Sequence, residues 1–574
     1  MKLILKYLKP YRGFLAITFL IKAIGTVVEL IIPYILSHIV DVIVPKQVLG
    51  KIIFWGAMMI ACAAVAQLCN VVANRRSVLT ARETTRRVRH DLFHASLHLS
   101  CRNADKLTIP SLESRLTSDT YNLHHFIGMM QRIGIRAPLL LLGGILITLV
   151  LDAHLALVMI AVLPFLAMFV VFISKKTIPL YLEVQKNVDG MVRVVREDSQ
   201  GIRVIKALSK KNYERKRFDN ANRKLVKTEK KVGYITALSN PIMQVCMNMG
   251  LVGVVLLGAY RVNADLTQPG KIIAFIQYFT LISTSMMVLS RIFMAYSKGV
   301  ASANRIGEVI DIENEIIPHS EEDLPYSDND LHISFENVSF GYHKNKHVLH
   351  DISFGLKKGQ TLGIIGATGS GKSTLIQLLM RFYDVGEGSV KINGHDVRTI
   401  DKNELHSMFG VALQNDFLFN GSVKENIDFG RNLDFEDIKT AARRAQALEF
   451  IEEFPEGFEH EITSKGTNIS GGQRQRLLIS RALAGSPDIL ILDDSSSALD
   501  YKTDLNLRRA IAEQDEDTTV IIVAQRVSSV MNSDLIIVLD DGKIDGMGTH
   551  AELIESCQIY KEISDSQMGG AFLE

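Results

Sequence analysis

The sequence predicts two unlike domains in one chain: an all-α domain of six membrane-crossing helices, followed by an α/β domain. Three observations lead to this prediction. Long apolar runs separated by basic loops fill the first 310 residues of a chain of 574. A β-rich segment then begins near residue 330. Within it, an apolar strand, a glycine-rich loop and a helix follow one another. We therefore expect a membrane domain at 1–310, an acidic linker at 311–330 and an α/β domain at 331–574.

Six segments are long and apolar enough to cross a hydrocarbon core of ~30 Å, which takes roughly 20 residues as helix. The hydrophobic share of 47% and the mean hydropathy of +0.15 are high for a soluble protein with 22% charged residues. Six such runs argue against buried helices of a large soluble core. The predicted spans are 14–38, 52–74, 128–151, 154–174, 235–260 and 272–295.

Basic residues concentrate in two of the loops between the spans. The loops after the second and fourth spans are rich in arginine and lysine, whereas the three opposite loops are short and hold few basic residues. The positive-inside rule therefore predicts a multi-pass protein of the cell membrane, with both termini and the α/β domain cytoplasmic. The opening MKLILKYLKPYR precedes an apolar run without an A-x-A-like cleavage site, so we interpret it as part of an anchor helix.

The second and fourth spans are expected to continue as helices beyond the membrane. Between Lys51 and Ile109 there is no proline and a single glycine. About 50 helical residues would span ~75 Å, far more than a bilayer is thick. The segment 174–234 likewise predicts two extended helices. The turns near 103–112 and 205–216 are candidate docking points for the second domain.

Several polar residues lie inside the predicted spans. Intramembrane polar groups are costly and usually face a bundle interior or a wet cavity. Any single one of them is equally compatible with hydrogen bonding between helices or an interfacial position, but the set indicates a water-accessible path. They are Lys22, Glu29, Gln67, Asn70, Gln131, Arg132, Arg136, Gln244, Asn248, Gln277 and Arg291.

The glycine-rich loop of the second domain matches a phosphate-binding motif. In GATGSGKST the spacing Gly366-x4-Gly371-Lys372-Ser373 fits GxxxxGK[ST], whose backbone N–H groups wrap phosphates at a helix N-terminus. Lys372 would reach the β- and γ-phosphates, and the Ser373 hydroxyl would hold Mg²⁺. Asp493 ends a later apolar strand and suits a second contact to Mg²⁺. The expected ATP-binding loop is Gly366, Ala367, Thr368, Gly369, Ser370, Gly371, Lys372, Ser373 and Thr374.

A further motif, NISGGQRQRLLISRAL at 468–483, resembles the signature of the ATP-binding cassette family, with Ile469 where leucine is usual. Other motifs of that family follow in order: Tyr342 in VSFGY, Gln414 in VALQNDFLF and SALD ending at Asp500. Six spans fused to one cassette make the whole chain similar to an ABC exporter half-transporter. LESRLTSD (112–119) and GIRVIKALSKKNYERKRF (201–218) resemble the coupling loops of that class.

The resemblance implies roles for these residues. Tyr342 would stack on adenine, and Gln414 would serve Mg²⁺ and catalysis as the glutamine of the Q-loop. Two cassettes would meet head to tail, so that each ATP lies between the phosphate-binding loop of one and the signature of the other. The signature residues expected to contact the partner's ATP are Ser470, Gly471, Gly472 and Gln473.

Three residues depart from the family pattern. Asp494 stands where the family has its general-base glutamate, Gln525 where it has a histidine, and Ser464 where it has another glutamate. An aspartate draws its carboxylate back by about one methylene, whereas a base must sit about 2.6–3.2 Å from its water. A glutamine can hydrogen bond but cannot become cationic. We therefore expect this chain to bind ATP while cleaving it weakly.

These features predict a subunit of an ATP-driven exporter of hydrophobic or amphipathic compounds, paired with a second half-transporter. A heterodimer is favoured because a homodimer, though possible, would have two poor sites. Lipid or peptide export stays open, as does an ATP-gated pore or regulator that does not pump. Lys and Arg total 64 against 62 Asp and Glu, which gives no indication of nucleic-acid binding. The five scattered cysteines indicate neither a metal site nor a disulfide framework.

Overall fold

The structure is a computed structural model of the chain. It describes residues 1–312, 324, 326, 330–342, 346–414, 416–495, 498–512 and 517–568, so most of the predicted linker at 311–330 lies outside the described residues. The chain forms two compact units. The first comprises 1–97 and 108–312, and the second comprises 98–107 and 313–574. Each unit is described by itself.

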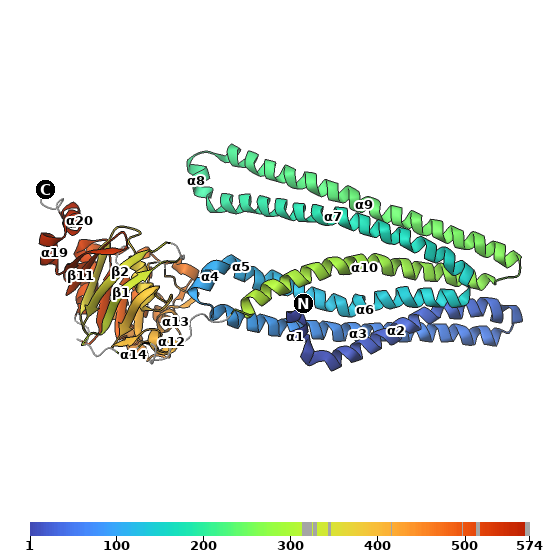
Figure 1. The fold of residues 1–574 in the computed structure, drawn as a ribbon, viewed down its shortest axis with the longest axis horizontal. Helices are drawn as coiled ribbons and strands as arrows, with labels where there is room; N and C mark the ends of the chain where they lie inside the picture. The colour runs from blue at the N-terminus through green and yellow to red at the C-terminus, as the bar shows by residue number, and fades with distance from the viewer. Residues whose placement is uncertain are drawn as a thin grey trace. The chain divides into compact units, whose positions relative to one another are not determined.

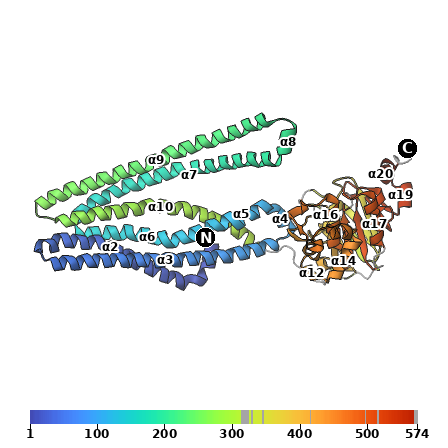
Figure 2. The same ribbon diagram turned by 180° about the vertical axis from the view of Figure 1, so that it is seen from behind.

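The first unit is entirely helical, and its described residues include six helical stretches long and apolar enough to cross a membrane, as predicted. Each predicted span lies within one of its long helices. Figures 1 and 2 show these helices running side by side. Their bounds, with the short helices between them, are α1 (Lys2–Leu8), α2 (Arg12–His38), α3 (Leu49–Leu97), α5 (Ile109–Ser114), α6 (Thr120–Leu151), α7 (Ala153–Gln200), α8 (Ile202–Ala207), α9 (Lys211–Asn263) and α10 (Pro269–Ile310).

The three longest of these helices extend far beyond a bilayer. Helix α3 has 49 residues, α7 has 48 and α9 has 53. Helices α7 and α9 form a hairpin closed by α8. The turn at α8 begins a few residues earlier than the predicted 205–216. At the opposite end, the Asp152 side chain caps α7 by accepting from the backbone N–H of His154 and of Leu155.

Polar contacts tie the helices together inside the bundle. The Tyr278 hydroxyl of α10 donates to the Leu30 carbonyl of α2 at 2.6 Å. Arg136 of α6 pairs with Glu29 of α2. Gln131 is buried, and among the described residues its amide has no hydrogen-bond partner. Interhelical bonding therefore accounts for some of the polar residues within the spans, but not for Gln131.

The second unit is built on two main sheets. An antiparallel sheet has the order β2-β1-β4-β5, and a six-stranded sheet has the order β12-β11-β3-β10-β9-β6, parallel except for its edge strand β12. Strands β7 and β8 form a separate pair. The strands are β1 (Ile333–Phe340), β2 (Leu349–Leu356), β3 (Thr361–Gly366), β4 (Glu387–Ile392), β5 (His395–Asp396), β6 (Phe409–Ala412), β7 (Gly421–Ser422), β8 (Glu461–Ile462), β9 (Ile489–Asp493), β10 (Thr519–Val523), β11 (Leu535–Asp540) and β12 (Lys543–Gly548).

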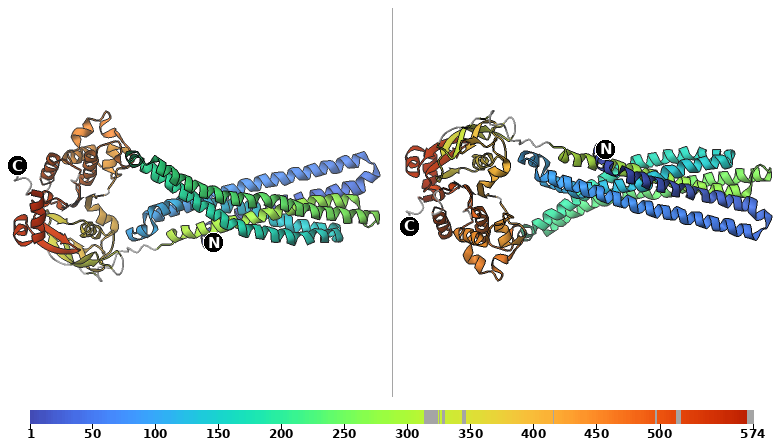
Figure 3. Two further views of the ribbon diagram at one scale, coloured as in Figure 1. Left: turned by 90° about the horizontal axis from the view of Figure 1, so that it is seen from above. Right: turned by 90° about the horizontal axis from the view of Figure 1, so that it is seen from below.

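The strands at the centre of the six-stranded sheet are mostly apolar, because parallel strands are covered on both faces. All five residues of β9 are buried. Figure 3 shows a largely helical segment, in orange, beside the yellow-to-red sheets of this unit. The helices are α11 (Lys372–Leu379), α12 (Lys402–Ser407), α13 (Val423–Asp428), α14 (Phe435–Arg444), α15 (Leu448–Glu452), α16 (Gly471–Leu483), α17 (Tyr501–Ala512), α18 (Val527–Val530), α19 (His550–Ser556) and α20 (Gln558–Met568).

One short helix from the N-terminal half belongs to the second unit. Helix α4 (Cys101–Leu107) lies within residues 98–107, which group with the C-terminal residues. The Tyr383 hydroxyl, just beyond α11, donates to the Asp105 carboxylate at 2.6 Å. Part of the turn expected at 103–112 is thus in contact with the α/β domain.

Candidate nucleotide-binding site

The site lies at the carboxyl ends of four neighbouring parallel strands. Strands β3, β10, β9 and β6 are adjacent in that order, and their ends lead into loops on one edge of the sheet. Ligands of open α/β sheets bind at this edge. The register pairs Val523 with Asp493 and Ala412 with Leu492, so the residues just beyond them converge.

The loop after β3 needs glycine at two positions where the backbone is crowded. Gly366 has φ +156°, and a Cβ there would lie 2.1 Å from the Leu539 carbonyl oxygen. Gly371 has φ +104°, and its Cβ would lie 2.5 Å from a methyl group of Leu349. These glycines let the chain turn sharply from β3 into α11, which leaves backbone N–H groups facing the loop's hollow.

Lys372 begins α11 and reaches back over this loop. Its ammonium donates to the carbonyl oxygens of Gly366 at 2.9 Å and of Ala367 at 2.7 Å. Burial lowers the pKa of Lys372, while the nearby carboxylates of Asp493 and Asp494 act in the opposite direction. The cation is thus held beside the hollow where a phosphate chain would lie.

Ser373 and Asp493 offer a pair of hard oxygen ligands. The Ser373 hydroxyl donates to Asp493 Oδ2 at 3.0 Å, and Asp493 is buried at the end of β9. Burial raises the pKa of Asp493, and the Ser373 hydrogen bond partly opposes this shift. Hydroxyl and carboxylate oxygens suit Mg²⁺, which otherwise keeps water and substrate phosphates as ligands. These residues therefore fit Mg²⁺, which when bound would neutralise phosphate charge.

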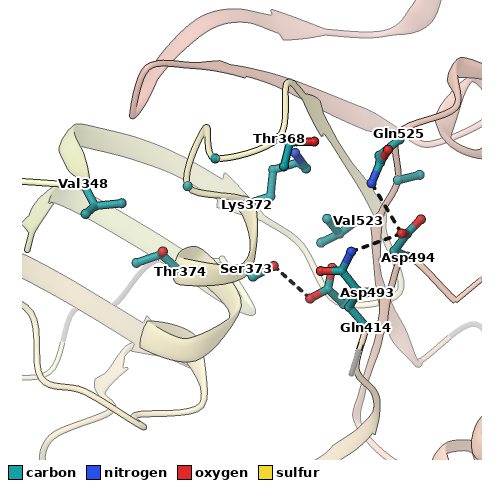
Figure 4. A pocket seen from close by; sticks show the side chains of 13 residues that line it. Val348, Thr368, Lys372, Ser373, Thr374, Gln414, Asp493, Asp494, Val523 and Gln525 are labelled. Atoms are coloured by element: carbon teal, nitrogen blue, oxygen red, sulfur yellow. Dashed lines mark hydrogen bonds between the residues drawn. The ribbon is translucent and has the colours of Figure 1, made fainter. Parts of the chain in front are cut away.

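Asp494 lies between two amide side chains, as Figure 4 shows. Its Oδ2 accepts from Gln414 Nε2 at 3.3 Å and from Gln525 Nε2 at 3.4 Å. Asp494 adopts the left-handed backbone region with φ +51°, and its N–H donates to the Val523 carbonyl. The carboxylate that follows the strand is therefore fixed by backbone and side-chain contacts alike.

These groups surround one cavity of about 270 Å³. The structure brings together in it most of the phosphate loop, Gln414, both aspartates and Gln525. Sequence reasoning missed three apolar lining residues, although Val523 and Ala524 could have been inferred from their place at the end of β10. The lining residues are Val348, Thr368, Gly369, Gly371, Lys372, Ser373, Thr374, Gln414, Asp493, Asp494, Val523, Ala524 and Gln525.

Comparisons with known proteins agree over nearly the whole chain. Residues 15–286 match the family described as ABC transporter transmembrane region, and residues 349–497 match the family described as ABC transporter. The ABC transporter ATP-binding protein YfiB of Bacillus subtilis is 33% identical over 567 residues, covering 98% of each chain. YknU of the same organism is 32% identical over 98% of this chain and 96% of its own.

The chain belongs to the ABC transporter family. A solved structure, that of a bacterial Atm1-family ABC exporter with ATP bound, superposes with a TM-score of 0.81 at 23% identity, covering 97% of this chain and 98% of that one. The chain thus has the fold of an ABC exporter half-transporter: a helical membrane domain fused to an ATP-binding cassette. It is an ATP-driven transporter with ATPase activity.

Tyr342 lies beside the phosphate loop of this transporter but not in the lining of the cavity. Its hydroxyl donates to Gln377 Oε1 at 2.6 Å and lies 3.2 Å from Thr374 Oγ1. Its ring meets the Tyr383 ring edge-on. These contacts anchor Tyr342 on α11, and its stacking on adenine stays a prediction.

The signature residues Ser470, Gly471, Gly472 and Gln473 do not line the cavity that holds the chain's own phosphate loop. They begin α16, where Ser470 Oγ accepts from the Gln473 N–H and the Gln473 side chain accepts from the Ser470 N–H. This reciprocal capping orders the first turn of the helix. Gly471 and Gly472 leave its N-terminus free of side chains.

Proposed function

We propose that this chain is one subunit of a heterodimeric exporter of hydrophobic or amphipathic compounds, and that its own nucleotide site is degenerate. The observation that carries the proposal is the environment of Asp494. Its Oδ2 accepts hydrogen bonds from the amides of Gln414 and Gln525, at 3.3 and 3.4 Å.

Such an arrangement favours binding over cleavage. The hydrogen bonds from Gln414 and Gln525 direct the Asp494 carboxylate toward these two amides. The aspartate is also one methylene shorter than the family's glutamate, so it stands further from a water positioned on the γ-phosphate. Gln525 offers an amide where the family's histidine can carry a charge. In contrast, the phosphate loop, Lys372, Ser373 and Asp493 keep what ATP and Mg²⁺ need.

The position of the signature supports a shared second site. Ser470 and the glycines of α16 lie outside the chain's own cavity, so they are available to another cassette. In a heterodimer they would complete the partner's ATP site, whose glutamate and histidine would carry out hydrolysis. Both cassettes and both termini would be cytoplasmic, as the loop charges predict.

The test compares two variants of the assembled complex. Gly471→Asp places a carboxylate at the signature, and Asp494→Asn removes the local carboxylate while keeping its size. We expect Gly471→Asp to abolish most of the total ATPase and Asp494→Asn to change it less than about twofold, because the productive site lacks Asp494 and donors on developing phosphate charge are worth about 10²–10³-fold. Equal or reversed losses would contradict the asymmetric arrangement.

A pore or regulator that uses ATP only to hold two cassettes together is the second candidate. The same Asp494 and Gln525 favour it, because slow cleavage prolongs the closed dimer. Substrate-stimulated ATP turnover by the complex, together with uphill accumulation of substrate in inside-out vesicles, would exclude it. Substrate movement only down its gradient would instead support it.

A further inference from the structure

The membrane unit contains a cavity whose lining includes three basic residues, three neutral polar residues and no acidic one. It has a volume of about 390 Å³, within the range of small-molecule sites. It lies between α2, α3, α6 and α10, at the end of the spans from which α3 continues as a long extension. Its lining residues are Lys22, Asn74, Arg132, Ile133, Arg136, Ala137, Leu140, Leu281, Thr284, Ser285 and Val288.

One of its three cations has an acidic partner. The Arg136 guanidinium donates to both carboxylate oxygens of Glu29, at 2.6 and 3.2 Å. Lys22 is only 3% exposed, and its ammonium donates to Asn70 Oδ1 at 2.8 Å and Asn74 Oδ1 at 3.0 Å. Two neutral amides orient this ammonium without cancelling its charge.

Among the described residues, Arg132 has neither an acidic partner nor an amide partner. Within the part of the chain that the structure describes, its guanidinium makes no ion pair and no hydrogen bond, although it lines the cavity on the same helix as Arg136. An arginine stays charged at any physiological pH. A charge inside a membrane span is costly, and such residues mark substrate or ion pathways. Three cations against the single carboxylate of Glu29 leave the cavity with excess positive charge.

Apolar side chains also line the cavity, beside the hydroxyls of Thr284 and Ser285. Ile133 and Leu140 of α6 face it together with Leu281 and Val288 of α10. Apolar side chains near a guanidinium and an oriented ammonium match a molecule that has a hydrophobic body and an anionic group. A neutral or cationic compound would leave Arg132 uncompensated.

We propose that this cavity is a binding subsite for amphipathic organic anions, with Arg132 and Lys22 holding the anionic group and Ile133, Leu140, Leu281 and Val288 the hydrophobic body. The inference rests on the proposed export function and narrows its substrate class. The anion could be a water-soluble carboxylate or the head group of an anionic lipid, because both present the same chemistry to the cavity.

The experiment measures binding without ATP, using the assembled complex in phosphatidylcholine nanodiscs. The probes are N-dansyl-leucine and N-dansyl-leucinamide, which differ in a carboxylate against a neutral amide. We expect tighter binding of the carboxylate, and a roughly ten- to hundredfold loss of that affinity in Arg132→Gln, as for loss of a hydrogen bond between charged groups. The matched control is Arg75→Gln, an exposed arginine next to Asn74 on α3 that does not line the cavity.

Several outcomes overturn the inference. Equal binding of the two probes by the wild type would do so, as would equal losses in Arg132→Gln and Arg75→Gln. Lys22→Gln gives a second reading in case the first variant fails to assemble: it too should lower affinity for the carboxylate probe and spare the neutral one. If Lys22→Gln assembles but loses affinity for both probes equally, the substitution has altered the cavity as a whole. That result would count against a subsite for the anion.

Lipid composition identifies the source of the anion. If phosphatidylglycerol in the nanodisc displaces N-dansyl-leucine in the wild type but not in Arg132→Gln, the subsite is supported with a lipid head group as occupant. If it does not, discrimination between the probes supports a soluble anion. Binding needs no ATP, so the two proposals can fail separately. A complex that discriminates between the probes but does not transport them supports the subsite and contradicts export. A complex that transports both probes equally supports export and contradicts the subsite.

Discussion

At the scale of single residues, the proposed degenerate site differs from the family pattern by one methylene at Asp494, where the family has glutamate, and by an amide at Gln525, where it has histidine. Asp494→Glu adds one methylene to the side chain and so moves its carboxylate toward the γ-phosphate. Gln525→His restores a side chain that can carry charge. A correctly placed general base is worth about 10²–10⁴-fold. We expect a smaller gain, and only in the double variant, because Ser464 also departs from the family pattern.

The measurement is trapped-nucleotide turnover at this chain's site, with the partner's catalytic glutamate changed to glutamine. Adding Lys372→Ala to the double variant should remove the gain, because the loop then loses its phosphate cation. If the double variant turns over as slowly as the wild type, residues other than Asp494 and Gln525 limit the site. Faster turnover need not increase transport, since early release of the dimer would uncouple the cycle.

A buried histidine makes cassette stability dependent on pH. His332 is 4% exposed, and its Nδ1 lies 2.6 Å from Thr519 Oγ1. Burial lowers the pKa of His332 below its ordinary value. As pH falls below about 6.5, the unfolded chain therefore binds the proton before the folded chain does, and folding free energy is lost. We expect the midpoint temperature of thermal unfolding of the cassette to decrease as the pH is lowered from 7.5 to 5.5.

The variant His332→Asn keeps a polar group near Thr519 but has no imidazole to protonate. Its midpoint temperature of unfolding should therefore decrease less steeply as the pH is lowered. The exposed His347→Asn is the matched control and should follow the wild type. Identical slopes for all three proteins would show that His332 does not contribute. Some slope should persist in His332→Asn, because burial also lowers the pKa of His406.

At the scale of elements, the sequence was most informative where a local pattern decides the structure. Six apolar runs predicted six spans, because length and hydropathy alone decide whether a helix can cross a bilayer. The phosphate loop was equally predictable from its glycines and Lys372. The pairing of strands distant in sequence was not predictable, so Val348 was missed from the cavity. The periodicity of the sequence also could not show that Tyr342 would hydrogen bond to Gln377 on α11, since that contact depends on tertiary packing.

Helix α4 allows a test of how strongly one element is held to the rest of its unit. The Tyr383 hydroxyl is its hydrogen-bonded contact to the region after α11, through Asp105. Removing that hydroxyl in Tyr383→Phe should cost about 0.5–1.5 kcal/mol and so loosen α4 by roughly two- to tenfold, without affecting ATP binding. Amide hydrogen exchange across residues 98–107 in the full-length complex measures the change. Tyr213→Phe, at an exposed tyrosine of α9, should leave that exchange unchanged, and equal exchange in both variants would show that this hydrogen bond does not hold α4.

At the scale of the whole molecule, the α7–α9 hairpin of the membrane unit ends in exposed apolar side chains. Helix α8 exposes Ile202 by 46% and Val204 by 60%, and Leu208 beyond it by 62%. Residues 201–210 group with the membrane unit, whereas α4 groups with the cassette. Three exposed apolar side chains on a six-residue helix and its cap indicate a contact made in the assembled transporter. We expect that contact to be with a cassette, near the loop that follows Gln414.

Cysteine crosslinking tests this expectation. Leu418 is fully buried, so the reporter belongs at Phe417, which is 42% exposed, with its partner at Lys210 on the turn. The native cysteines must first be replaced, because four of the five are only half-buried. A double variant of this chain that carries Lys210→Cys and Phe417→Cys should form a bridged product with a short bifunctional reagent. The pair Asp105→Cys and Tyr383→Cys, whose wild-type side chains are hydrogen bonded, is the positive control. Burying the apolar side chains of α8 against a cassette would stabilise the assembled transporter, so the crosslink should form in at least one nucleotide state. If the control pair reacts and the test pair does not react in any state, α8 docks elsewhere.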